Sequence, residues 1–207
     1  MDTHRTPSAP GLRERKKQAT RQALSWAAIR LTVERGLDNV LVEDIAAEAG
    51  VSARTFNNYF SSKAEAIAAR HLDRSRRVAD ALRERPAAEP LWPALLAAVL
   101  AEAGGEAVPD PQWAAGVRLM VTDPALQGEM LKAGAEAARE LAVAVAERTG
   151  ADAERDLHPQ LVAAAVGAAV QVATAQWLRE DTATSMSALL REALELLAAG
   201  LPAPSAP

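Results

Sequence analysis

The 207-residue sequence contains no cysteine, which excludes a disulfide framework, thiolate catalysis and any cysteine-ligated metal. Aromatic residues make up only 3%, and isoleucine occurs three times, so residues that favour strands are scarce. The longest apolar run in the second half, residues 161–170, is shorter than a membrane span requires. The first ten residues are polar and contain no segment of the signal-peptide type. We therefore expect a cytoplasmic protein with no membrane partner.

Alanine and leucine dominate what is present, with 49 and 24 occurrences. Both are strong helix formers, and no stretch alternates polar and apolar residues over a strand length. Apolar residues are 49% and charged residues 24% of the chain, as in an ordinary globular protein. The sequence therefore predicts an all-α fold, with about nine helices.

The net charge of −4 is unevenly distributed along the chain. Residues 1–85 contain 16 Lys and Arg against 11 Asp and Glu, whereas residues 86–207 contain 7 against 16. A basic first part beside an acidic second part indicates that the first part meets a polyanion. The alternative is an uneven surface charge without a function.

Proline and glycine positions divide the chain. Pro86 and Pro90 bracket a break that we interpret as the boundary between two domains. The expected segments are a disordered tail (1–12), a first domain (13–62), a linking helix (63–85), a second domain (86–200) and a disordered tail (201–207). Helices are expected in the second domain at residues 91–103, 112–121, 124–148, 158–179 and 184–199.

The most informative stretch is 42–60, which reads as two short helices joined by a tight turn. Gly50 permits the backbone reversal, and Ser52 is a favourable N-cap for the second helix. Phe56 and Phe60 are four residues apart and should point inward. This leaves the second helix with a largely outward set of small and polar residues: Ala53, Arg54, Thr55, Asn57 and Asn58. The pattern predicts a helix-turn-helix whose second helix enters a major groove.

The outward residue types suit the reading of base edges. Arginine can bond guanine in a bidentate manner, asparagine can do the same with adenine, and threonine offers a hydroxyl and a methyl group. Ala53 at the start of the helix allows a close backbone approach. The alternative is an ordinary helical hairpin whose polar residues face water.

The stretch 42–60 resembles the central signature of the N-terminal DNA-binding domain of the TetR family of transcriptional regulators. Residues 27–37 resemble the end of the family's first helix, and residues 59–65 resemble the start of its fourth. The resemblance covers about residues 13–70 and implies a DNA-binding regulator with a helical ligand-binding and dimerisation domain. Val40 and Leu41 depart from it, because two hydroxyl residues are usual there. Asn57 stands where an aromatic residue often contacts DNA.

The start of the expected helix at residue 63 combines a structural and a functional signal. Ser62 and Glu65 form a capping box. Lys63 lies in the first turn, where a cation opposes the helix dipole, and a nearby phosphate would offset that cost. The resemblance implies contacts with the DNA backbone at Lys63 and Tyr59. The alternatives are a solvated lysine and a tyrosine packed against the first helix.

A basic cluster precedes the motif, and its residues are Arg13, Arg15, Lys16, Lys17 and Arg21. Such a cluster can bind phosphates or place an arm in the minor groove. The alternative is a charged terminus that only increases solubility.

The expected helix at 158–179 is apolar on nearly all sides, so it must be covered on two faces. One face is made of small residues and, with the last helix, could form a four-helix dimer interface. The predicted interface residues are Ala164, Ala168, Gln171, Ala175, Leu190 and Leu197. The resemblance implies dimerisation through the same two helices, and the alternative is a central helix of a monomeric bundle.

Bulky residues in the alanine-rich second domain can leave a cavity between them. The candidate lining residues are Trp92, Trp113, Val117, Met120, Met130 and Trp177, with Arg118 and His71 as polar contacts. The alternative is that these side chains fill the core.

Enzyme chemistry has little support in this sequence. The histidines, His4, His71 and His158, are scattered, and no phosphate-binding loop or nucleophile elbow is present. We therefore expect no enzyme activity, no metal and no cofactor. The sequence predicts a homodimeric repressor, released from a near-palindromic double-stranded DNA operator by a small, largely apolar effector. The alternatives are a helical small-molecule binding protein without an operator and an enzyme built on a helical bundle.

Overall fold

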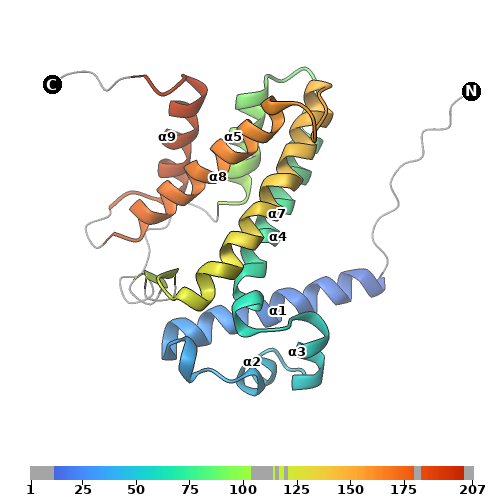
Figure 1. Ribbon diagram of the computed structural model, residues 1–207, viewed down its shortest axis with the longest axis vertical. Helices are drawn as coiled ribbons and strands as arrows, with labels where there is room; N and C mark the ends of the chain where they lie inside the picture. Colours follow the sequence, from blue (N-terminus) through green and yellow to red (C-terminus); the bar gives the residue numbers. More distant parts are fainter. Residues whose placement is uncertain (1–11, 104–113, 115–116, 119–120, 180–182, 203–207) are drawn as a thin grey trace, which may run out of the picture.

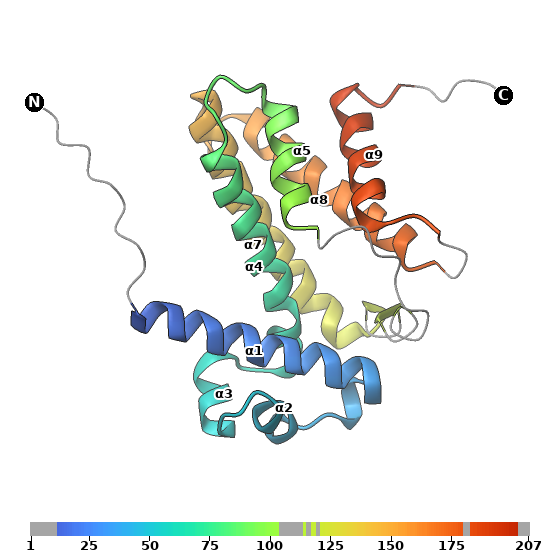
Figure 2. The ribbon, with the colours of Figure 1, turned by 180° about the vertical axis from the view of Figure 1, so that it is seen from behind.

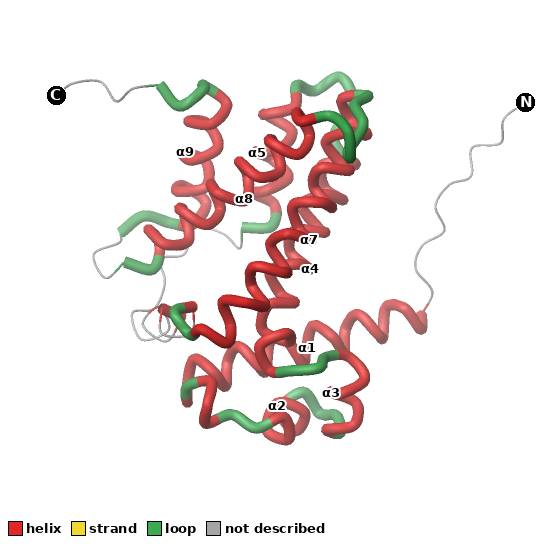
Figure 3. The backbone as a smooth tube through the Cα atoms, in the orientation of Figure 1, coloured by secondary structure: helices red, strands yellow, loops and turns green. Residues whose placement is uncertain are grey.

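The structure, a computed structural model, describes residues 12–103, 114, 117, 118, 121–179 and 183–202. Within these residues it contains eight α-helices, one 3₁₀ helix and no strand (Figures 1 and 3). The all-α prediction is therefore confirmed. The helix expected at residues 112–121 lies mostly outside the described residues.

One long helix and three short elements form the N-terminal bundle: α1 (Leu12–Arg35), η1 (Leu37–Asn39), α2 (Val42–Glu48) and α3 (Ala53–Tyr59). Leu24, Leu31 and Ile45 are buried together with the two phenylalanines of the motif. The rings of Phe56 and Phe60 lie 5.7 Å apart between their centroids. Both phenylalanines point inward, as their four-residue spacing predicts.

Two long helices, α4 (Lys63–Glu84) and α7 (Pro124–Thr149), run side by side in the same direction (Figures 1 and 2). Ion pairs along their length join Arg76 to Glu136 at 2.6 Å and Arg83 to Glu147 at 2.7 Å. Asp123 caps the start of α7 by accepting from the N–H of Ala125. The two helices form the central column of the molecule.

The second core lies between the later parts of this column and three further helices: α5 (Leu91–Ala101), α8 (Leu157–Trp177) and α9 (Met186–Ala198). At the end of α7, Arg148 donates to the carbonyls of Arg85, Pro86 and Glu89, which fixes the loop between α4 and α5. The break expected around Pro86 is therefore a tightly bonded corner of the structure.

The beginning of α7 contacts the N-terminal bundle. Leu126 is fully buried within the core that Phe56 and Phe60 occupy, and Met130 packs against the same core. Ala68, Leu72, Ala133 and Ala137 form a small apolar cluster at the α4–α7 junction and bridge the two larger cores. The N-terminal bundle is thus held by two helices of the column rather than by α4 alone.

A largely buried ion pair ties α1 to α4. A single nitrogen, Nη1 of Arg21, donates to both carboxylate oxygens of Asp73, at 2.7 and 2.8 Å. The side chains are only 20% and 11% exposed, and the Arg21 guanidinium carbon lies 5.1 Å from the centre of the Phe60 ring. Arg21 therefore differs from the rest of the predicted basic cluster, because an acidic partner 52 residues away in sequence engages it.

We expect Arg21→Leu to destabilise the protein by about 3 kcal/mol, because it leaves Asp73 buried without a partner. The double variant Arg21→Leu with Asp73→Leu should recover most of this loss, since it buries no charge. Urea unfolding measures both. Arg83→Leu is the matched control, because its ion pairs lie nearer the surface and should contribute about 1 kcal/mol or less. Equal losses in Arg21→Leu and Arg83→Leu would contradict this prediction.

Candidate nucleic-acid interface

The turn between α2 and α3 has the geometry that the sequence predicts. Gly50 adopts a positive φ of 70°, which an L side chain rarely allows. The N–H groups of Gly50 and Val51 donate to the carbonyls of Ala47 and Ala46, at 3.0 and 2.9 Å. Ser52 caps α3 by accepting from the N–H of Thr55 at 3.2 Å. These contacts close the turn and set the direction of α3.

The outer side of α3 presents polar side chains to solvent. Arg54, Asn57 and Asn58 are exposed, and none of them bonds to another side chain in the part of the chain that the structure describes. Ala53 and Thr55 are half-buried, and the Thr55 hydroxyl lies 2.9 Å from that of Ser52. The polar groups of Arg54, Asn57 and Asn58 are thus available to a ligand on this face, and their contact with bases stays a prediction.

Tyr59 lies at the edge of the N-terminal core. It is half-buried, and its ring centroid is 6.4 Å from that of Phe60. The ring therefore packs at the edge of this core, and the alternative of packing against the first helix in particular stays open. A contact between the exposed part of Tyr59 and a phosphate stays a prediction.

Lys63 has a structural role that the sequence did not reveal. Its ammonium group donates to the carbonyl oxygens of Leu37 and Val40, at 2.8 and 2.7 Å. Leu37 is the first residue of η1 and Val40 follows its last, and the partial negative charge of these two carbonyls accommodates a cation in the first turn of α4. The solvated-lysine alternative is wrong. An ammonium group has three donors, so one remains for a phosphate.

The caps of α2 and α4 show how the departures from the family pattern are accommodated. At α4 the Ser62 hydroxyl accepts from the N–H of Glu65, as predicted. The Glu65 carboxylate, however, accepts from the N–H and hydroxyl of Ser61 rather than from Ser62. At α2 the Leu41 side chain offers no acceptor, and the Asp44 carboxylate accepts from the N–H of Leu41. Only one half of a capping box remains at α2.

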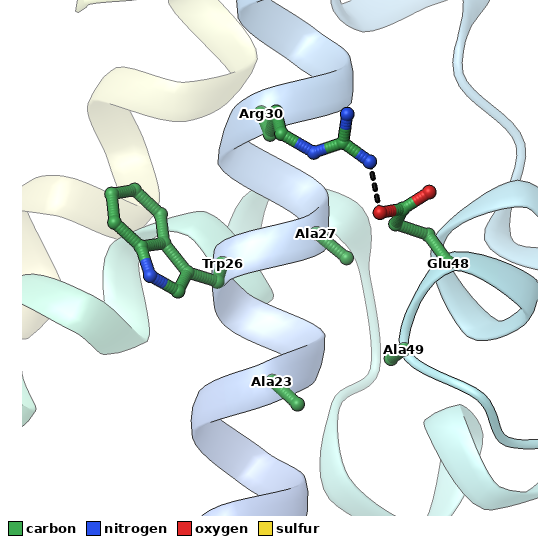
Figure 4. Close-up of a pocket in the computed structure, with 6 residues that line it drawn as sticks. All are labelled: Ala23, Trp26, Ala27, Arg30, Glu48 and Ala49. Atoms are coloured by element: carbon green, nitrogen blue, oxygen red, sulfur yellow. Dashed lines mark ion pairs between the residues drawn. The ribbon is translucent and has the colours of Figure 1, made fainter.

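The surface of α1 carries the rest of the basic cluster. Arg13, Arg15, Lys16 and Lys17 are exposed, which leaves their predicted contact with phosphates open. Further along α1, Arg30 pairs with Glu48 of α2 beside a shallow groove lined also by Ala23, Ala27 and Ala49 (Figure 4). Trp26 belongs to the same lining, but its ring points away from this ion pair (Figure 4).

The described residues that were predicted to line an effector pocket are divided between two cores. Trp92 and Trp177 pack against the C-terminal core, whereas Met130 packs near the N-terminal bundle. Met130 therefore packs against a different core from the two tryptophans, and a pocket that joins them stays a prediction. Val117 is half-buried, and Trp113 and Met120 lie outside the described residues. Trp177 has a buried indole nitrogen without a hydrogen-bond partner in the described part of the chain.

The structure describes both polar residues expected at the pocket, and their contact with an effector stays a prediction. Arg118 donates to the carbonyl oxygen of Leu178, next to the end of α8. His71 is half-buried on α4, where burial and the neighbouring Arg74 lower its pKa. His71 is therefore biased toward its neutral form.

The predicted dimer face is partly present on the surface. Ala164, Ala168, Gln171 and Ala175 are exposed on α8, and they are joined there by Leu161 and Val172, which are 63% and 57% exposed. Leu190 is only 2% exposed, and Leu197 packs against the same C-terminal core. These two leucines are not on a free surface, because the apolar stripe of α9 is needed by its own bundle. Leu196 is the exposed leucine of α9 instead.

The all-helical fold and the exposed α3 define a helix-turn-helix DNA-binding protein. Residues 26–69 match the family described as bacterial regulatory proteins, tetR family. Residues 89–202, more than half of the chain, match the family described as MftR C-terminal domain. The chain therefore belongs to the TetR family of transcriptional regulators.

Individual relatives agree with this assignment. The chain is 33% identical to the HTH-type transcriptional regulator TcmR of Streptomyces glaucescens, over 94% of this chain and 90% of TcmR. It is 30% identical to MftR of Mycobacterium tuberculosis, named as a mycofactocin biosynthesis transcriptional regulator, over 90% and 93% of the two chains. Both are regulators rather than enzymes. The fold resembles that of the fatty acid degradation regulator FadR of Bacillus halodurans, with a TM-score of 0.57, 18% identity and coverage of 94% and 98%.

We expect Lys63→Met to lower the free energy of unfolding by about 2 kcal/mol, because two charge-assisted bonds to carbonyls are lost. If the third donor meets a phosphate, the slope of log K against log salt for DNA binding should also fall by about 1. Urea unfolding and a salt titration of DNA binding measure the two effects separately. An unchanged unfolding free energy would contradict the structural role, and an unchanged salt slope would contradict the phosphate contact.

Proposed function

We propose that this regulator is a repressor that binds a near-palindromic operator as a homodimer and is released by a small, largely apolar effector. The observation that carries the proposal is the exposed polar face of α3, where Arg54, Asn57 and Asn58 have no side-chain partners among the described residues. We also propose that it works in the cytoplasm, where the operator is. A helical binding protein without an operator would have no need of this face.

The dimer proposal rests on the unburied apolar surface of α8. Its most apolar 18-residue window has a mean hydropathy of 1.2, which passes the length and composition test for a membrane-spanning helix, yet only 33% of that window is buried. The apolar part of this helix is therefore longer than the uninterrupted run at residues 161–170. Leu161, Val172 and Leu196 expose large side chains around the small ones. A second copy related by a two-fold axis would cover this face.

Two copies would present their α3 helices to successive major grooves, roughly 34–36 Å apart. An effector that binds better to a conformation with a different spacing would weaken operator binding, because only differential affinity shifts a population. Two helices connect the second core directly to the N-terminal core that contains α3. Residues 63–84 form a helix common to both cores, and Leu126 of α7 is buried within the N-terminal core.

We expect Arg54→Ala to weaken operator binding by about 1–3 kcal/mol while binding to random DNA falls less, because an arginine contact with a guanine edge is sequence-specific. A gel shift on operator and random DNA measures both. The control is Arg155→Ala, which removes an exposed arginine in the loop before α8. Equal losses on both DNAs would contradict the base contact. Failure of the unmodified protein to prefer any DNA sequence would favour the binding protein without an operator.

We expect Ala168→Glu to give a folded monomer, because two helices cannot approach closely across an unpaired charge. Operator binding should then fall roughly 10²-fold, since each half-site would be bound alone. Sedimentation and circular dichroism measure assembly and folding together. Ala135→Glu, at an exposed site on α7, is the control and should remain dimeric. A folded dimer of Ala168→Glu would place the interface elsewhere.

We expect a hydrophobic effector to stabilise the protein and to weaken operator binding in the same concentration range, because the two couplings are reciprocal. At a free concentration of about 100 times Kd, stabilisation should reach about 2.7 kcal/mol. A melting-temperature screen of apolar compounds followed by gel shifts measures this. A compound that stabilises the protein without changing DNA affinity would contradict a pocket that controls operator release.

A further inference from the structure

A second groove lies between α1 and α4, and Trp26 belongs to the lining of both grooves. Its lining residues are Gln22, Ser25 and Trp26 from α1 and Arg70, Asp73 and Arg77 from α4. The guanidinium carbon of Arg70 lies 4.0 Å from the centre of the Trp26 ring. The groove therefore joins the DNA-binding bundle to the central column, and neither the proposed DNA contacts nor the proposed dimer uses it.

The groove contains side-chain donors that have no hydrogen-bond partner among the described residues. Ser25 is 2% exposed, and its hydroxyl oxygen has no hydrogen-bond partner in the part of the chain that the structure describes. A buried hydroxyl without a partner costs free energy and is uncommon in folded proteins. Gln22 also makes no side-chain hydrogen bond with any described residue. Both side chains can donate to an acceptor placed in the groove.

Positive charge exceeds negative charge around this groove. Arg70, Arg74 and Arg77 follow one another on α4 at spacings of four and three residues, which places them on one face. Asp73 already accepts two bonds from Arg21, and Arg77 is paired with Glu102 at 2.6 Å. Arg70 and Arg74 make no ion pair with any described residue. Burial lowers the pKa of both, and the neighbouring arginines lower these pKa values further, whereas Glu102 acts in the opposite direction on Arg74.

We propose that the groove between α1 and α4 is a binding site for a compact anionic group, a phosphate or a carboxylate, held by Arg70 and Ser25. An anion there would neutralise the unpaired guanidinium and accept from the orphaned hydroxyl. Because Ser25 belongs to α1 and Arg70 to α4, the bound anion would bridge the DNA-binding bundle and the helix that links it to the second core. The anion is either free or the headgroup of a molecule with an apolar tail.

The experiment uses the indole N–H signal of Trp26, one of four in the protein, identified by its loss in Trp26→Phe. The full chain is titrated with inorganic phosphate, octanoate and octanol, each against sodium chloride at matched ionic strength. We expect a saturable shift of the Trp26 signal with phosphate if a free anion suffices. A saturable shift with octanoate but with neither phosphate nor octanol would also support the site and would identify an anionic headgroup with a tail. No saturable shift with either anion would overturn the proposal.

Three variants test the assigned residues. Arg70→Gln should weaken anion binding at least tenfold and Ser25→Ala at least threefold, whereas Arg83→Gln, at the other end of α4, should leave it unchanged. Ser25→Ala should be no less stable than the unmodified protein without the anion, and it should gain less stability when the anion is added. Unchanged anion binding in Arg70→Gln would overturn the proposal. A reduced salt slope of DNA binding in Arg70→Gln, with no anion shift in the unmodified protein, would make Arg70 a DNA contact instead.

Discussion

The ion pair between Arg21 and Asp73 is the contact on which the arrangement of the two parts of this molecule most depends. It joins the middle of α1 to the middle of α4, and the Arg21 guanidinium also lies against Phe60, the residue that follows α3. One side chain of α1 therefore contacts both α4 and the residue that follows α3, and the relative positions of these three elements decide where α3 points. Since both carboxylate oxygens are occupied and the pair is largely buried, small displacements of α1 against α4 are costly.

The same constraint explains how a change in the second core would reach α3. The column of α4 and α7 is held along its length by ion pairs, and both helices contact the N-terminal core at their beginnings. A ligand that displaced one helix of the column against the other would therefore act on α1 through Asp73 and on the N-terminal core through Leu126. The groove between α1 and α4 lies at this same junction, so an anion bound there would affect the displacement of α1 against α4.

Local signals were sufficient to predict the N-terminal bundle. The turn at Gly50, the cap at Ser52 and the spacing of Phe56 and Phe60 each depend on residues close together in sequence, and the structure contains all three. The roles that were missed depend on distant partners. Arg21 finds Asp73 52 residues away, and Lys63 finds carbonyls 23 and 26 residues away. No pattern within α1 or at the start of α4 specifies such partners.

The second domain was harder to predict because its alanine-rich helices have several apolar faces. Composition alone does not decide which face of α9 packs inward, so Leu190 was assigned to the surface and Leu196 was overlooked. Likewise, Met130 was grouped with Trp92 and Trp177 by its bulk, although it packs against a different core. The small-residue face of α8 is exposed, as a dimer interface requires, and its residues recur on one side of a single helix.

Selection of bound sequences from random double-stranded DNA by the full chain tests the central claim most directly. The account predicts an enriched inverted repeat whose half-sites lie about one helical turn, roughly 10–10.5 base pairs, apart or a multiple of it. That result requires both a sequence-reading α3 and a two-fold assembly. Enrichment of a single unrepeated site would contradict the dimer, and no enrichment at all would contradict α3 as the reading helix.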